Sequence, residues 1–195
     1  MRKQVVIDID GILWTLGEHW YTELIKINPE CPFPGLTNWA FFEGYMSEEE
    51  ALGAVKKVHM NQDSENYEPF PSACKLTHML NRANYKIVIA SHRDPESYDA
   101  TAKWLGRNMF HYDELYTGPD KHPYLDDPNT VLFIDDSPSS QQYALDRGVD
   151  TYSIRYSYNE HVEDVNFFDD FEDLLVNGIR EWIVKDGNLE QYLEV

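Results

Sequence analysis

Short, nearly unbroken runs of apolar residues alternate along this chain with longer segments whose apolar positions recur every three or four residues. The clearest runs are residues 4–9, 85–90 and 130–134, with shorter candidates at 114–117 and 151–155. Strands buried on both faces read as such continuous runs, so these segments are predicted to form a mainly parallel sheet. Helices are expected between them, which favours an α/β fold of the doubly wound kind.

Local signals mark where the intervening helices begin and end. Ser72 and Asp94, the latter followed by proline, are expected to be N-caps, and Gly148 to end a helix. The expected helices run over about 72–84, 95–107, 139–147 and 168–185.

Residues 14–71 do not follow this alternation. They contain a helical stretch near 19–27, a run of prolines, and a capping box in which Ser47 and Glu50 open a helix to about Met60. The segment is rich in aromatic residues. It is predicted to be a small helical cap inserted after the first strand, with residues 1–13 and 72–195 forming the core.

The net charge of -19 over 195 residues changes the range of possible partners. An acidic surface repels polyanions, so binding of a nucleic acid polymer is not expected. An anionic substrate would need local positive charge, from basic residues or from a metal ion. Clustered carboxylates are the ligands that Mg²⁺ prefers.

The cysteines and the hydropathy argue against two further classes. Cys31 and Cys74 form no C-x-x-C pattern, which argues against a structural zinc site and a disulfide framework. No stretch approaches the roughly 18 apolar residues of a membrane span, and no signal-peptide pattern fits the start. A cytoplasmic setting is expected, whereas the sequence does not indicate an oligomeric state.

Acidic residues follow the first predicted strand as Asp8-Ile9-Asp10-Gly11. Carboxylates at positions i and i+2 point to the same side of an extended chain, and like charges there favour a shared cation. In a chain with 35 acidic residues, this string alone indicates a functional site no more strongly than a chance occurrence.

Three further polar groups follow other predicted strand ends. Asp135-Asp136 ends the most apolar strand, Ser91 ends the second strand, and Lys121 lies in the loop before Asp135. Separately, Ser91 reads as a turn residue and Lys121 as a solvated lysine. Because the carboxyl ends of parallel strands form the ligand-binding edge of a sheet, the ordered set predicts a phosphate and metal site.

The succession of an acidic pair, serine, lysine and a second acidic pair resembles the haloacid-dehalogenase (HAD) superfamily. The resemblance spans about residues 5–156 and implies a parallel sheet with a cap domain. It further implies a Mg²⁺-dependent phosphatase in which Asp8 is the nucleophile and Asp10 the general acid and base.

The same resemblance assigns the remaining site residues. Mg²⁺ would be held by Asp8, the backbone carbonyl of Asp10, Asp135 and, directly or through water, Asp136. The transferring phosphate would be held by Ser91, His92 and Lys121, with Lys103 as the alternative to Lys121.

A cap after the first motif is typical of HAD enzymes that act on small molecules. Within that group the chain looks most like the 5′(3′)-deoxyribonucleotidases. The features that carry this resemblance are the strings Asp8–Leu13 and Tyr158-Asn159 and the spacing of Lys121 from Asp135. The resemblance implies base stacking on cap aromatics, for which Phe41, Phe42 and Tyr45 are candidates, although packing inside the cap is the commoner role. Arg93 is a candidate phosphate contact.

Other functional classes fit the sequence less well. A receiver domain would carry its nucleophile on the third strand, and no G-x-x-x-x-G-K-[ST] string supports an NTPase. A HAD-like protein that binds a phosphorylated ligand or a partner without turnover stays open, as do HAD phosphatases for sugar phosphates or polynucleotide ends.

Overall fold

A computed structural model describes residues 2–33 and 41–186. In chain order the elements are β1 (Gln4–Ile7), α1 (Gly17–Ile27), α2 (Glu48–Asn61), α3 (Ala73–Arg82), β2 (Lys86–Ser91), η1 (Pro95–Ser97), α4 (Tyr98–Arg107), β3 (Glu114–Thr117), α5 (His122–Leu125), β4 (Thr130–Ile134), α6 (Pro138–Leu145), β5 (Asp150–Ile154), β6 (Asn166–Phe168), α7 (Phe171–Asp173), the π-helical η2 (Leu174–Ile179) and α8 (Arg180–Lys185).

The strands form one six-stranded sheet in the order β3-β2-β1-β4-β5-β6, and every pair in it is parallel. The predicted α/β fold is thereby confirmed. From β1 the chain builds outward on one side through β2 and β3, and on the other through β4, β5 and β6. The order in which strands are added to the sheet reverses between β1 and β4. Open parallel sheets bind ligands at such a reversal point, beyond the carboxyl ends of the strands.

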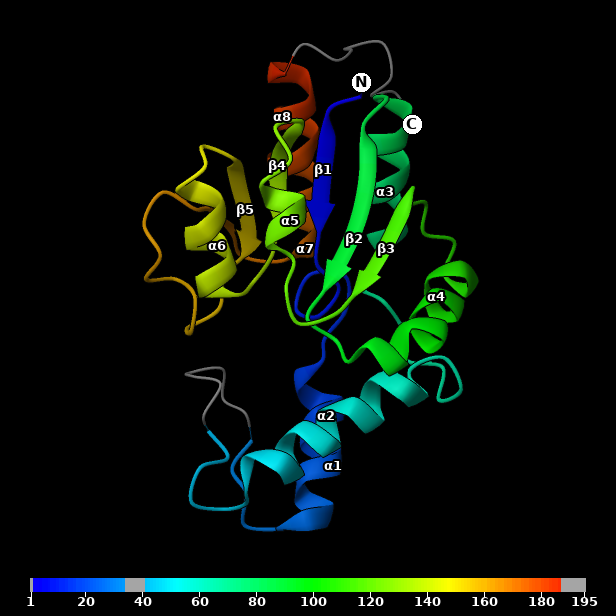
Figure 1. The fold of residues 1–195 in the computed structure, drawn as a ribbon, viewed down its shortest axis with the longest axis vertical. Helices are drawn as coiled ribbons and strands as arrows, with labels where there is room; N and C mark the ends of the chain where they lie inside the picture. Colours follow the sequence, from blue (N-terminus) through cyan, green and yellow to red (C-terminus); the bar gives the residue numbers. More distant parts are fainter. Residues whose placement is uncertain (1, 34–40, 187–195) are drawn as a thin grey trace.

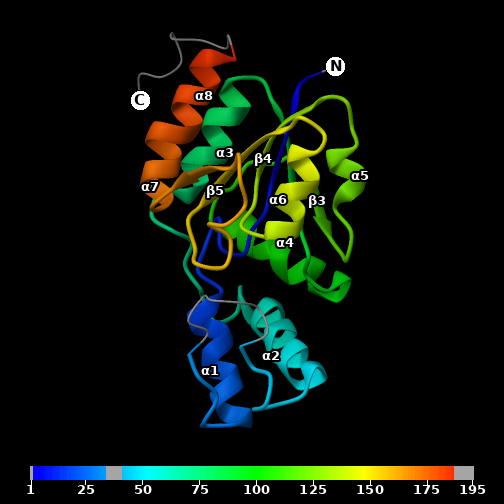
Figure 2. The same cartoon turned by 90° about the vertical axis from the view of Figure 1, so that its left-hand side faces the viewer.

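Alternating side chains of the strands feed two separate cores. Val5 and Ile7 of β1 pack with the cluster that includes Leu76 of α3 and Leu174 of η2, whereas Val6 packs with Leu125 and Ala144 of α5 and α6. Figure 2 shows the corresponding layers, with α3, α7 and α8 on one face of the sheet and α5 and α6 on the other. Strands covered on both faces must be apolar throughout, which explains the unbroken apolar runs.

The helices α1 and α2 lie beyond the carboxyl ends of the strands (Figure 1). They pack on each other, and Trp20 of α1 donates a hydrogen bond from Nε1 to the carbonyl of Ala51 at 3.0 Å. Ser47 and Glu50 form the predicted capping box at the start of α2. This helix pair therefore covers the edge of the sheet on which the acidic residues lie.

Two expectations about local structure were wrong. Ser72 occupies the N-cap position of α3, but its backbone is left-handed, with a φ of 67°, and its side chain makes no capping hydrogen bond. The helix expected from residue 168 starts at Phe171, where Asp170 caps it, and it includes a π-helical turn. Residues 166–168 instead pair with β5 as a short edge strand, β6.

Candidate active site

Asp8 and Asp135 are brought together by the pairing of β1 with β4. Ile7 pairs with Ile134, so the next residue of each strand, Asp8 and Asp135, emerges at the same edge of the sheet. Asp136 completes the group: carboxylate oxygens of Asp8, Asp135 and Asp136 all lie within 4.8 Å of one another, and all three residues are buried.

A single buried lysine compensates part of this charge. Lys121 is 1% exposed, and its Nζ donates hydrogen bonds to Asp8 Oδ1 at 2.9 Å and to Asp135 Oδ2 at 2.5 Å. Burial alone would lower the pKa of Lys121, but the two carboxylates raise it above its usual value, so the ammonium stays charged. Lys103, the alternative, is exposed on α4. The structure thus places Lys121 at the predicted position.

One ammonium does not balance three carboxylates. Burial, together with Asp135 and Asp10, raises the pKa of Asp8 to about 6 despite the opposing effect of Lys121. Burial, together with Asp135 and Asp8, raises the pKa of Asp136 well above its usual range. Unbalanced negative charge on oxygen-only ligands is the environment that Mg²⁺ requires, so these residues fit the ion that the sequence predicts.

Hydrogen bonds from outside the group orient its members. Asp135 Oδ1 accepts from the backbone N–H of Ser137 at 2.7 Å, and Asp136 accepts from the hydroxyl of Tyr158. Gly11 has a φ of 74°, and a Cβ there would come within 2.2 Å of Asp136 Oδ2. Only glycine meets both conditions, which explains the glycine in the Asp-Ile-Asp-Gly string.

Asp10 lies beside the group, but its side chain turns toward Arg93. The guanidinium of Arg93 donates from Nε to Asp10 Oδ2 at 2.9 Å and from Nη2 to Oδ1 at 2.8 Å. Trp14 Nε1 donates to Oδ1 at 2.7 Å, and His59 Nε2 lies 3.3 Å from Oδ2. Burial raises the pKa of Asp10, but Arg93 and His59 more than offset this and hold it well below its usual range.

This geometry corrects the predicted role of Arg93. All its described hydrogen bonds are internal: besides Asp10, Nη1 donates to Gln62 Oε1 at 2.6 Å and to Thr101 Oγ1 at 3.0 Å. The side chain is 1% exposed and does not line the cavity above the carboxylates. Arg93 is therefore a partner of Asp10, Gln62 and Thr101, and it lies outside the cavity in which a phosphate would bind.

A cavity of about 240 Å³ lies between the sheet edge and the two cap helices. Its core side contains the predicted residues Asp8, Asp10, Ser91, His92, Lys121, Asp135 and Asp136, together with Ser137. Its cap side consists of Leu16, Trp20, Leu52, Val55 and His59. The structure thus gathers every predicted core residue except Arg93 around one cavity.

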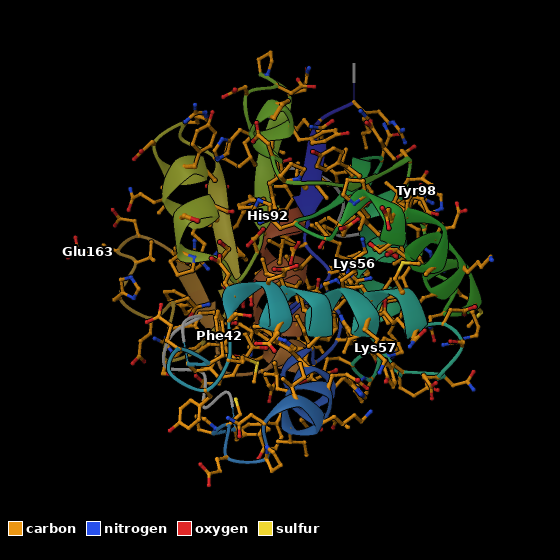
Figure 3. All side chains as sticks on the ribbon, turned by 60° about the horizontal axis from the view of Figure 1, so that its bottom comes forward. Phe42, Lys56, Lys57, His92, Tyr98 and Glu163 are labelled. Atoms are coloured by element: carbon orange, nitrogen blue, oxygen red, sulfur yellow. The ribbon has the colours of Figure 1, made fainter. Side chains whose placement is uncertain are left out.

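The predicted cap aromatics lie elsewhere. Phe41 packs edge-on against Trp20 with ring centroids 5.0 Å apart, and Phe42 packs on both. Figure 3 shows Phe42 near the start of α2, on the opposite side of that helix from His92. Neither these two residues nor Tyr45, which is exposed, lines the cavity. The stacking role of Phe41 and Phe42 is corrected to packing inside the cap, and Tyr45 is exposed. Among the described cap residues, Trp20 is the aromatic that lines the cavity.

Several site residues gave no recognisable signal in the sequence. His59 and Gln62 are far from Asp10 and Arg93 in the sequence, and only the folded chain brings them together. Trp14 follows Asp10 by four residues, but its bond to the Asp10 carboxylate depends on the turn between them. The sequence points to Asn159 through the Tyr158-Asn159 string. It does not predict that Asn159 Nδ2 donates a hydrogen bond to the carbonyl of Asp136 at 3.2 Å.

Two negative expectations concern the rest of the chain. Among residues 2–33 and 41–186, no helix is long and apolar enough to cross a membrane. Both cysteines are free thiols, Cys31 buried and Cys74 half-buried.

Comparison with known sequences gives one limited likeness. No family model matches the chain. A protein of Bacillus cereus, whose name marks it as a candidate nucleotidase, is 26% identical over 99 residues. That match covers 48% of this chain and 52% of the relative, so the chain spans about half the length of the curated relative it matches.

Comparison with solved structures covers nearly the whole chain. A haloacid dehalogenase-like hydrolase from Streptococcus pneumoniae matches at 19% identity with a TM-score of 0.60, covering 89% of this chain and 97% of its own. β-Phosphoglucomutase from Clostridium difficile gives 13% identity, a TM-score of 0.60 and coverage of 95% and 99%. D,D-heptose 1,7-bisphosphate phosphatase from B. bronchiseptica, complexed with magnesium and phosphate, matches at 13% identity with a TM-score of 0.54, covering 93% of this chain and 99% of its own. Together with the parallel sheet and its buried carboxylates, these likenesses show that the chain has the fold of the HAD-superfamily hydrolases.

Proposed function

We propose that this chain is a Mg²⁺-dependent phosphomonoester hydrolase that forms an aspartyl-phosphate on Asp8. The observation that carries the proposal is the position of Asp8 at the reversal point of the sheet, within 4.8 Å of two other buried carboxylates and bonded to Lys121. A nucleophilic carboxylate, a cation-binding oxygen cluster and a buried ammonium are the parts that phosphoryl transfer needs.

In the first half-reaction, a carboxylate oxygen of Asp8 attacks phosphorus and the bond from phosphorus to the ester oxygen breaks. Bound Mg²⁺, held by Asp8, Asp135 and Asp136, would supply the positive charge that lets an anionic nucleophile approach an anionic phosphate. Ser91, His92 and Lys121 line the cavity where they can contact the phosphate oxygens. The leaving oxygen takes a proton from Asp10 when Asp10 is protonated. A leaving group that is itself a weak base departs without a proton.

In the second half-reaction, water attacks the phosphorus of the aspartyl-phosphate and the bond to Asp8 breaks, which releases phosphate. The proton of the attacking water goes to Asp10. Because Arg93 and His59 hold the pKa of Asp10 well below its usual range, the carboxylate is ionised, which is the state that can take a proton, and the same two partners make it a weaker base. The charge state of Asp10 therefore suits the base role of this half-reaction and not the acid role of the first.

We further propose a small substrate such as a (deoxy)nucleoside monophosphate. Two observations support it: the partial likeness to the Bacillus cereus protein, and a cavity of about 240 Å³ covered by α1 and α2. Trp20 offers the cavity one aromatic side chain.

The test is phosphate release from p-nitrophenyl phosphate with and without metal. We expect turnover with Mg²⁺, none in EDTA, and recovery on adding Mg²⁺ back, because the three carboxylates otherwise repel the substrate. A panel of phosphomonoesters, including deoxynucleoside 5′- and 3′-monophosphates, then ranks the substrates. If sugar phosphates outran every nucleotide, the nucleotidase specificity would be wrong; metal-independent or absent turnover would overturn the hydrolase.

Asp10→Asn is expected to separate the two half-reactions. The variant keeps the nucleophile and the metal cluster, so p-nitrophenolate, which needs no proton, should appear as a rapid burst of one equivalent per enzyme. Steady turnover should then fall by about 10²- to 10⁴-fold, since the attacking water lacks a base. Stopped-flow absorbance measures both phases. A slow steady state without a burst would mean that Asp10 acts before the aspartyl-phosphate forms.

A further inference from the structure

The two sides of the active-site cavity differ sharply in chemistry. The core side carries the carboxylates, Lys121, two serines and His92. On the cap side, Leu52, Val55 and His59 occupy positions i, i+3 and i+7 of α2, a spacing that puts them on one stripe of the helix. Leu16 and Trp20 from the start of α1 complete this side. We call Leu16, Trp20, Leu52 and Val55 the apolar roof.

His59 belongs to the reacting end of the cavity and not to the roof. It is 5% exposed, and its Nε2 lies 3.3 Å from Asp10 Oδ2. The remaining cap residues around the cavity offer no polar side-chain group, since the indole N–H of Trp20 is directed to the carbonyl of Ala51. Within the described residues, the roof therefore presents only hydrocarbon and aromatic surface to the part of a substrate that is not the phosphate.

Positive charge near the cavity is already committed. Lys121 is the one lysine or arginine among its described lining residues, and it is bound between Asp8 and Asp135. Lys56 of α2 pairs with Asp94 at 3.0 Å and with Glu96 at 2.8 Å, and Lys57 pairs with Glu23 of α1 at 2.6 Å. Figure 3 shows Lys56 and Lys57 on opposite sides of α2, Lys56 toward α4 and Lys57 away from it.

We infer that the substrate carries a single phosphate on an organic group that is apolar where it meets the roof. This inference rests on the proposed hydrolase and specifies its substrate class. Mg²⁺ and Lys121 would serve the first phosphate, so a second would meet four carboxylates and no further lysine or arginine among the described lining residues. A polyhydroxylated sugar would leave hydroxyls unpaired against the roof, at a cost of about 10- to 100-fold in kcat/KM for each.

The experiment compares primary alkyl phosphates whose leaving alcohols have similar basicity. Benzyl phosphate, glucose 6-phosphate, fructose 6-phosphate and fructose 1,6-bisphosphate are assayed with Mg²⁺, each in parallel with Asp8→Asn. We expect kcat/KM for benzyl phosphate to exceed that for glucose 6-phosphate by at least about 100-fold, as several hydroxyls face the roof. The bisphosphate should gain nothing over fructose 6-phosphate, because no group binds its second phosphate.

Variants of the roof test whether the roof causes this preference. Leu52 is 54% exposed, so Leu52→Asn should fold. Leu52→Asn and Val55→Asn should each reduce kcat/KM for benzyl phosphate and so narrow the difference in kcat/KM between benzyl phosphate and glucose 6-phosphate. Met60→Gln, an exposed position of the same helix outside the cavity, is the matched control and should change neither rate. Circular dichroism confirms folding of each variant.

The outcomes separate this inference from the function on which it rests. Asp8-dependent turnover in which glucose 6-phosphate or the bisphosphate equals or exceeds benzyl phosphate would overturn the inference and leave the hydrolase standing. An unchanged preference in the two roof variants would also overturn it. No Asp8-dependent turnover of any of the four compounds would overturn the proposed function itself.

Discussion

Replacing Asp8 with asparagine is expected to lower phosphate release by about 10⁴-fold or more, the scale on which removal of a covalent nucleophile acts. Asparagine keeps the shape of the side chain but supplies no anionic oxygen to attack phosphorus. Phosphate release from p-nitrophenyl phosphate with saturating Mg²⁺ measures the loss. Asp164→Asn is the matched control, because Asp164 is exposed, and its φ of 65° suits asparagine equally well. Activity within tenfold of the parent in Asp8→Asn would contradict a covalent role for this carboxylate.

The same variant should unfold at a higher urea concentration than the parent in EDTA at pH 7. The pKa of Asp8 is raised to about 6 in the folded chain, so ionising it opposes folding. This penalty is absent below the unfolded pKa of about 3.9, grows as the pH rises toward 6, and is constant above that. The stability gain of Asp8→Asn should therefore be largest above pH 6 and should shrink toward pH 4. A variant that is inactive and less stable at pH 7 would instead indicate misfolding.

Arg93→Met is expected to reduce the free energy of unfolding by about 3–5 kcal/mol at pH 7, the cost of breaking a buried ion pair from one side. The substitution removes two donors from Asp10 and leaves Gln62 Oε1 and Thr101 without their partner. Urea unfolding in EDTA measures the loss. Arg155→Met, which removes an exposed ion pair with Asp169, is the control and should cost less than about 1 kcal/mol.

The destabilisation by Arg93→Met should depend on pH with a definite sign. In the parent, the depressed pKa of Asp10 stabilises the fold above the unfolded pKa of about 3.9, and this stabilisation is lost as the pH falls through the folded pKa. In the variant, burial raises the pKa of Asp10, so its protonation relieves the unpaired charge as the pH falls. The difference between parent and variant should shrink from pH 7 to pH 4. A difference that is constant with pH would mean that packing, and not the charge pair, dominates.

The fold was predictable because its signals are local. The strands β2, β3, β4 and β5 lie within one residue of the predicted runs, and Asp94 caps the next turn by accepting from the N–H of Glu96 at 2.8 Å. By contrast, β6 has three residues and is defined by its pairing with β5, not by a pattern of its own. Ser72 has the right residue type for a cap, but its backbone conformation is decided by the chain on either side of it.

The candidate site was predictable to the extent that strand ends position its residues. Asp8, Ser91 and Asp135 follow directly from parallel pairing, whatever the loops do. The direction of Arg93 depends on Gln62 and Thr101, and the roof depends on how α1 and α2 sit on the sheet edge. Tertiary contacts of this kind leave no periodic trace in the sequence, which is why Arg93 was assigned to phosphate and Phe41 and Phe42 to the cavity.

The central position of β1 has a consequence for synthesis on the ribosome. Its partners are β2 and β4, and Ile7 pairs with both Ile89 and Ile134. At roughly 5–20 residues per second, the first strand therefore waits about 6–25 seconds for its second neighbour to be translated. During this interval α1 and α2, whose contacts are close in sequence, can already form. Nascent chains are thus expected to expose the apolar β1 until the fourth strand emerges, and the nucleophile is assembled late.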